Sequence, residues 1–173
     1  MKRGLKISFL KSKKAQQTMG LPFGLIFSIF LIAVFVVAAI WAVTHFLDIG
    51  KCSEIGLFYD ELQNKVDEAW ASQTSEFNFK IDLPSGIKKI CFGNLTSEIT
   101  NQEDFSEIEI YYLEEANVFL VPSGEACNIP YYNLKHINIS EITKLENPYC
   151  VDLEKRNEIK IKKDFYDKNV LIE

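Results

Sequence analysis

Residues 21–47 read LPFGLIFSIFLIAVFVVAAIWAVTHFL, a run of 27 residues without a charged side chain. At about 1.5 Å per residue, a helix of this length measures roughly 40 Å. A transmembrane helix must cross a hydrocarbon layer of about 30 Å, whereas the apolar core of a signal peptide has only about 7 to 15 residues. The run therefore predicts a helix that stays in the membrane as an anchor.

Charged residues are distributed unequally on the two sides of this run. Six basic residues and no acidic residue precede it: Lys2, Arg3, Lys6, Lys11, Lys13 and Lys14. All 24 acidic residues lie at Asp48 or beyond. Because basic flanks stay in the cytoplasm, we expect a single-pass protein of the cell membrane with a cytoplasmic leader (1–20), a transmembrane helix (21–47) and an extracellular domain (48–173). The lipid bilayer is then a partner, and the acidic outer domain argues against nucleic acid.

All four cysteines lie on the extracellular side of this topology: Cys52, Cys91, Cys127 and Cys150. An even number of cysteines outside the membrane indicates two disulfides, for which three pairings exist. Closure of the Pro-, Tyr- and Asn-rich segment between Cys127 and Cys150 favours that bond, and this leaves Cys52 for Cys91.

Two sequons lie in the same part of the chain. They are Asn94-Leu95-Thr96 and Asn138-Ile139-Ser140. Such triplets also arise by chance, but in an external domain they indicate N-glycosylation at Asn94 and Asn138.

The helical pattern continues beyond the membrane. Between residues 55 and 70, apolar residues recur at three- and four-residue steps: Ile55, Phe58, Leu62, Val66, Ala69 and Trp70. Charged residues occupy the other sides of this segment. The spacing predicts an amphipathic helix that buries one face against a sheet.

After Ser72 the apolar period changes from 3.6 to 2, which indicates strands. Segments 77–83 and 87–92 flank Pro84-Ser85-Gly86, so we expect a β-hairpin there. We predict a loop at 94–104 and further strands at 108–112, 118–121, 134–139, 158–162 and 170–172. The fold class is α+β, with a long N-terminal membrane-spanning helix that continues as an amphipathic helix packed on an antiparallel β-sheet.

A processing signal lies between the basic leader and the apolar helix. Lys14, the last lysine of the leader, is followed by Ala15 and Gln16, and the long helix comes after them. This arrangement resembles the archaeal type IV pilin-like proteins with class III signal peptides. The resemblance implies that a membrane prepilin peptidase cuts after Ala15 and leaves Gln16 as the mature N-terminus. The alternative is an uncleaved anchor whose lysines only set the topology.

A closer likeness covers most of the chain. Segments 23–29 and 60–63, which read FGLIFSI and DELQ, resemble those of small archaeal membrane proteins, and this likeness implies no activity. The chain differs from many pilins at Gly20, the fifth residue after the cut, where a glutamate commonly aligns the subunits.

The sequence has no motif typical of catalysis. It lacks a Gly-rich phosphate loop, a His-Glu-x-x-His zinc motif and a Gly-x-Ser-x-Gly elbow. Its two histidines are His45, beside the predicted membrane surface, and His136, which we interpret as a strand residue rather than part of a Ser-His-Asp site. The acidic stretch 103–115 lacks a calcium-loop pattern and is interpreted as a solvated strand edge. We expect no enzyme activity, no cofactor and no metal site.

Two hypotheses of function remain. The first is a pilin-like structural or adhesive subunit that polymerises with identical subunits through its transmembrane helix. The second is a monomeric anchored binding or sensor domain, or a subunit of an envelope complex. Tyrosine pairs at 111–112 and 131–132 place one ring on each face of a predicted strand, and an exposed ring would suit a carbohydrate or protein contact.

Overall fold

The computed structural model describes residues 20–173, so the predicted leader and the cleavage residues Ala15 and Gln16 lie outside the described residues. The chain divides after Phe46 into two compact units. One helix, α1 (Gly20–Ala71), supplies residues to both units. The α+β prediction is confirmed, because this long helix is followed by antiparallel sheets.

The N-terminal half of α1 is apolar on every side. No described side chain between residues 23 and 47 is buried, and the large apolar ones are exposed throughout this half. The helix is long and apolar enough to cross a membrane. A helix that is hydrophobic all round needs lipid or other helices around it, so this half suits a membrane anchor.

The C-terminal half of α1 is one-sided. Its buried side chains follow the three- and four-residue spacing of the sequence: Ile55, Phe58, Tyr59, Leu62, Val66 and Ala69. Charged residues such as Asp60 and Glu61 are exposed on the other sides. The predicted amphipathic continuation is therefore confirmed.

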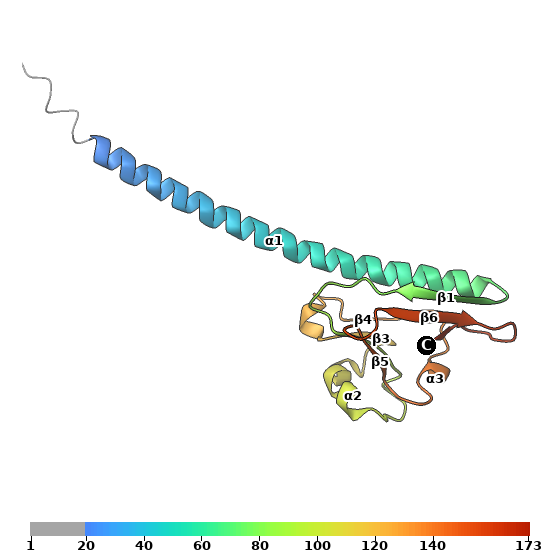
Figure 1. Cartoon of the computed structure of the whole chain (residues 1–173). Helices are drawn as coiled ribbons and strands as arrows, with labels where there is room; N and C mark the ends of the chain where they lie inside the picture. Colours follow the sequence, from blue (N-terminus) through green and yellow to red (C-terminus); the bar gives the residue numbers. More distant parts are fainter. Residues whose placement is uncertain (1–19) are drawn as a thin grey trace, which may run out of the picture. The chain divides into compact units, whose positions relative to one another are not determined.

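Seven strands form two antiparallel sheets in the unit that begins at Leu47 (Figure 1). The three-stranded sheet has the order β1 (Ser75–Lys80), β6 (Glu158–Lys163), β7 (Leu171–Ile172). The four-stranded sheet has the order β4 (Tyr131–Tyr132), β3 (Val118–Val121), β2 (Lys89–Phe92), β5 (Tyr149–Asp152). Short helices lie between the strands: α2 (Gln102–Ile108), η2 (Glu109–Tyr111), η3 (Ser123–Glu125) and α3 (Ile139–Ile142).

The four-stranded sheet separates two hydrophobic cores. The larger core contains Ile90 and Leu120 from this sheet, together with the buried face of α1 and the three-stranded sheet. The smaller core contains Cys91 and Phe119, packed with Ile108 at the end of α2. Successive strand residues thus alternate between the two cores, as the period of a β-strand requires.

The predicted hairpin of 77–83 with 87–92 is wrong. The chain does turn at Pro84, where the Ile87 N–H donates to the Pro84 carbonyl at 3.0 Å. However, β1 pairs with β6, and β2 lies between β3 and β5. The burial pattern agrees with this difference. β1 alternates exposed residues with half-buried or buried ones, whereas Ile90, Cys91 and Phe92 are all buried, as suits a strand covered on both faces.

The predicted strand at 108–112 is also wrong, because the chain is helical there. The Asn101 Oδ1 accepts a hydrogen bond from the Asp104 N–H at 3.1 Å and caps α2. Glu103 and Asp104 lie in the first turn, where negative charge complements the helix dipole. The N-cap signature therefore lies inside the segment that was interpreted as a loop.

The segment 134–139 is not a strand either. Only Ile137 forms a bridge, and its partner is Val170 in parallel orientation. The preceding residue, His136, has a φ of 65°, which interrupts an extended chain. In contrast, the predicted strands at 118–121, 158–162 and 170–172 correspond to β3, β6 and β7 within one residue at each end.

Candidate functional site

Two disulfides are present, but their pairing differs from the prediction. Cys91 bonds to Cys150, and Cys52 bonds to Cys127, so the expected Cys127–Cys150 and Cys52–Cys91 bonds are wrong. Sheet register explains the first bond, because Cys91 and Cys150 are partners on the neighbouring strands β2 and β5. The second bond ties α1 to the loop after η3. The prediction considered only the closure of the segment between Cys127 and Cys150, and not the register of the strands.

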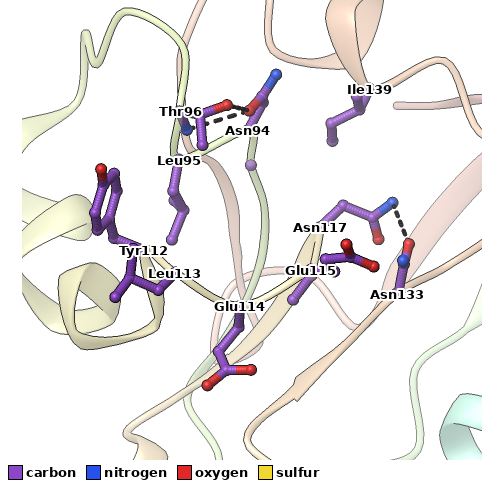
Figure 2. A pocket seen from close by; sticks show the side chains of 12 residues that line it. Asn94, Leu95, Thr96, Tyr112, Leu113, Glu114, Glu115, Asn117, Asn133 and Ile139 are labelled. Carbon is purple, nitrogen blue, oxygen red and sulfur yellow. Dashed lines mark hydrogen bonds between the residues drawn. The ribbon is translucent and has the colours of Figure 1, made fainter.

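A hollow of about 470 Å³ lies beside the first sequon (Figure 2). This size falls within the range of about 300–1,000 Å³ that is common for small-ligand clefts. Its lining comes from three parts of the chain: the sequon loop, the segment after η2, and the region around Asn133 and Ile139. Asn94 and Thr96 of the first sequon are among its lining residues.

Both apolar and polar groups line the hollow. Leu113 is 84% exposed and Tyr112 is 52% exposed, so both offer apolar surface to a ligand. Glu114 and Glu115 add carboxylates. The amide of Asn117 is already used, since it donates to the Leu134 carbonyl and accepts from the Leu134 N–H. The combination of an aromatic ring, an aliphatic side chain and hydrogen-bonding groups suits a sugar.

Of the two tyrosine pairs, one lies at the end of a helix and the other in a strand. Tyr111 lies in η2 and packs against the smaller core, while Tyr112 is exposed. Tyr131 and Tyr132 lie in β4 and pack against the smaller and the larger core, respectively. Hydrogen bonding to the Glu114 carboxylate raises the pKa of Tyr131. Tyr112 is therefore the tyrosine of these pairs that can contact a ligand.

The Asn94 sequon is held in a tight turn. The Asn94 Oδ1 accepts hydrogen bonds from the Thr96 hydroxyl at 2.8 Å and from the Thr96 N–H at 3.2 Å. The backbone of Asn94 is bound by Asn147, whose Nδ2 donates to the Asn94 carbonyl and whose Oδ1 accepts from the Asn94 N–H. The turn thus presents the Asn94 side chain from a fixed backbone.

Asn147 organises the whole sequon loop and was missed by the sequence analysis. It is only 3% exposed, and its Nδ2 also donates to the Glu98 carbonyl at 2.9 Å. Its carbonyl accepts from the N–H groups of Thr100 and Asn101. No local pattern indicates this role, because most of its partners lie about 50 residues away in the chain.

We expect Asn147→Ala to lower the free energy of unfolding by about 2–3 kcal/mol. The substitution leaves the Asn94 N–H, the Asn94 carbonyl and the Glu98 carbonyl without their partner, and each lost hydrogen bond costs about 1 kcal/mol net. Thermal unfolding of the full chain in detergent measures the change. Asn133→Ala, at an exposed position of the same hollow, is the control and should change stability by less than about 0.5 kcal/mol. Equal losses in the two variants would contradict this role of Asn147.

The second sequon is built into regular structure. The Asn138 Oδ1 accepts from the Glu141 N–H at 3.3 Å and caps α3. The Asn138 N–H donates to the Val170 carbonyl at 2.8 Å, and Ser140 belongs to α3. Ile139 lines the same hollow as Asn94, so the fold brings two sequons that are 44 residues apart to one region.

The acidic stretch belongs to α2, η2 and the segment that follows, so its interpretation as a strand edge is wrong. Lys89 on β2 pairs with Asp104 at 2.6 Å and with Glu107 at 3.3 Å. The hydrogen bond that the Lys89 Nζ donates to the Asp104 carboxylate raises the pKa of Lys89. These contacts join α2 to the sheet. Among residues 20–173, no three His, Cys, Asp or Glu side chains lie close enough together to hold a metal ion.

Both histidines stack on a tryptophan. His45 lies 5.6 Å from Trp41, measured between ring centroids, within the apolar half of α1. His136 lies 4.0 Å from Trp70, and its Nε2 is 3.9 Å from the Asp67 Oδ1. Trp70 also donates to the Lys168 carbonyl at 3.1 Å. His136 therefore takes part in a packed cluster at the C-terminal end of α1.

Comparisons with known proteins give no relative. No family model, no curated protein and no solved structure matches the chain.

Proposed function

We propose that the chain is a membrane-anchored, pilin-like structural or adhesive subunit with an extracellular C-terminal unit. The observation that carries this proposal is the continuity of α1. One helix is apolar all round over residues 23–47 and one-sided over 55–69, where it forms part of the core of the C-terminal unit. Such a helix joins a folded domain to a segment that can pack equally well in lipid or against other helices.

The surface of the apolar half supports packing between copies. Ala33, Val34, Val37 and Ala38 form a shallow apolar depression next to Trp41. Ala38 and Ala42 are small residues at four-residue spacing, which allows the backbones of two helices to approach closely. Since Gly20 replaces the glutamate of many pilins, packing of this kind would have to set the register of the subunits.

The extracellular placement is supported by the two disulfides and the charge distribution. Disulfides persist in oxidising compartments and are rare in the cytosol of most organisms. Both bonds lie beyond the apolar half of α1, and the six basic residues precede it. A basic leader in the cytoplasm and disulfides outside are mutually consistent.

Substitution of the proposed cleavage residue tests the function. We expect Ala15→Trp to keep its leader, to remain in the membrane fraction and to yield no filaments on shearing, because the peptidase requires a small residue before the cut. The N-terminal peptide is identified by mass spectrometry. The matched control Ala15→Gly keeps a small residue and should give a mature chain that starts at Gln16. If wild type and Ala15→Trp share the same N-terminal peptide and the same shear release, the chain is an anchored monomeric domain instead.

A further inference from the structure

We infer that Asn94, and not Asn138, carries an N-linked glycan, and that the first sugars of this glycan cover the hollow lined by Tyr112 and Leu113. The inference rests on the extracellular placement proposed above. It goes beyond the role of a subunit, because it assigns a modification site and states what occupies the hollow beside the Asn94 sequon.

The side chain of Asn94 is arranged for attachment. Its Oδ1 accepts two hydrogen bonds from Thr96, and within residues 20–173 its Nδ2 donates none. Figure 2 shows the nitrogen on the side of the amide that faces away from Thr96. Residues 93–97 lie outside every helix and strand, so the sequon occupies a loop that a transferase can reach. A sugar on Nδ2 leaves both hydrogen bonds of Oδ1 intact.

The attachment is a group transfer. The Asn94 Nδ2 forms a bond to C1 of the first sugar of a lipid-linked oligosaccharide. The bond between C1 and the phosphate oxygen of the lipid carrier breaks, and the phosphate leaves with the electron pair. The amide gives one proton to a base of the membrane-bound transferase, and no atom is oxidised or reduced. The Thr96 hydroxyl, 2.8 Å from the Asn94 Oδ1, is the sequon hydroxyl that this chemistry requires.

Asn138 is less suited to the same reaction. Its Oδ1 caps α3, its N–H bonds to Val170, and its carbonyl accepts from Glu141 and Ile142. Ile137, the residue before it, forms a β-bridge, and Ser140 lies within α3. A transferase would have to hold this segment away from both contacts. The backbone of Asn94 is also bound, by Asn147, but the Asn94 turn lies outside every helix and strand and already holds the Thr96 hydroxyl against the Asn94 Oδ1.

The lining of the hollow fits the first sugars of an attached glycan. A pyranose has a face of C–H groups, which packs on aromatic and aliphatic side chains, and hydroxyl groups, which donate to carboxylates. Tyr112 and Leu113 offer the first kind of surface, and the Glu115 carboxylate offers the second, whereas the Glu114 carboxylate already accepts from Tyr131. Asn94 is one of the residues that line the hollow, so an attached sugar starts beside it. In Figure 2 the Asn94 Nδ2 points away from Tyr112 and Leu113, so the glycan has to fold back over the sequon turn to cover them. The glycan would also shield apolar surface that is otherwise open to water.

The site of attachment is tested on the full chain, purified from its native host or from another host with an oligosaccharyltransferase. Intact mass and glycopeptide mass spectrometry locate the carbohydrate. We expect Asn94→Gln and Thr96→Ala to abolish it, and Asn138→Gln and Ser140→Ala to leave it unchanged. Two variants for each sequon separate a lost acceptor from a failure to fold. Carbohydrate at Asn138 alone, or at both sites, would overturn the assignment.

The coverage of the hollow is tested by hydroxyl-radical footprinting. Tyr112 should be oxidised several times more slowly in the glycosylated protein than after complete enzymatic deglycosylation. Tyr166, which is 93% exposed and does not line the hollow, is the internal control and should not change. An endoglycosidase that leaves only the sugar on Asn94 should preserve most of the protection. Equal oxidation of Tyr112 in all three samples would contradict the coverage.

A thiol count separates this inference from the proposed topology. Blocked cysteines without carbohydrate would mean that the C-terminal unit reaches an oxidising compartment and that the assignment of Asn94 is wrong. Free thiols without carbohydrate would mean that the extracellular placement is wrong, and the glycan with it.

Discussion

Replacement of both Cys52 and Cys127 by serine should lower the free energy of unfolding of the C-terminal unit by about 4 kcal/mol. The bond joins residues that are 75 positions apart. Opening a loop of that length raises the entropy of the unfolded chain, and this entropy stabilises the unfolded state by about 4 kcal/mol at 25 °C. Chemical unfolding of the full chain in detergent, followed by near-UV circular dichroism, measures the loss. An unchanged midpoint and slope would contradict the expectation.

The single variant Cys127→Ser tests the pairing itself. It should leave one free thiol, at Cys52, which a maleimide labels under denaturing conditions without reductant. Cys91 and Cys150 should stay unlabelled, since they remain bonded to each other. A label on Cys150 would instead support the Cys127–Cys150 bond that was predicted from the sequence.

Truncation of Leu62 to alanine should lower the free energy of unfolding by about 3 kcal/mol. Leu62 is fully buried in the larger core, and leucine-to-alanine changes at such positions cost about 2–5 kcal/mol because the cavity closes only in part. Unfolding in the same detergent is the measurement. The C-terminal half of α1 should loosen from the sheets before the rest of the unit does, which hydrogen exchange of residues 55–69 would detect.

Leu57→Ala is the matched control for this variant. Leu57 lies on the same helix and is 64% exposed, so the small gain in helix propensity from alanine is the same in both variants, while the loss of buried surface is not. We expect a change of less than about 0.5 kcal/mol. A similar loss in both variants would mean that the buried face of α1 has been assigned wrongly.

Several elements could be predicted because their signal is local. The apolar run at 21–47 and the spacing of residues 55–69 each identify one helix, and both lie in α1. The strand at 118–121 is four apolar residues before a proline, and it is β3. In the same sheet, β5 was missed, since Tyr149–Asp152 is too short and too mixed in polarity to stand out. The sequons at Asn94 and Asn138 could be found, but their different surroundings could not.

Local chemistry in the sequence was thus enough to establish the helix, its one-sided continuation, the α+β class and the presence of two disulfides. The partners of strands and cysteines were settled by packing. Alternation tells which side of a strand is buried, but the neighbour of that strand depends on contacts between segments far apart in the chain. Cys91 meets Cys150 because β2, buried on both faces, must be central, and Asn147 holds the Asn94 loop because β5 brings it there. Such contacts exist only after the chain has folded, so no sequence window contains them.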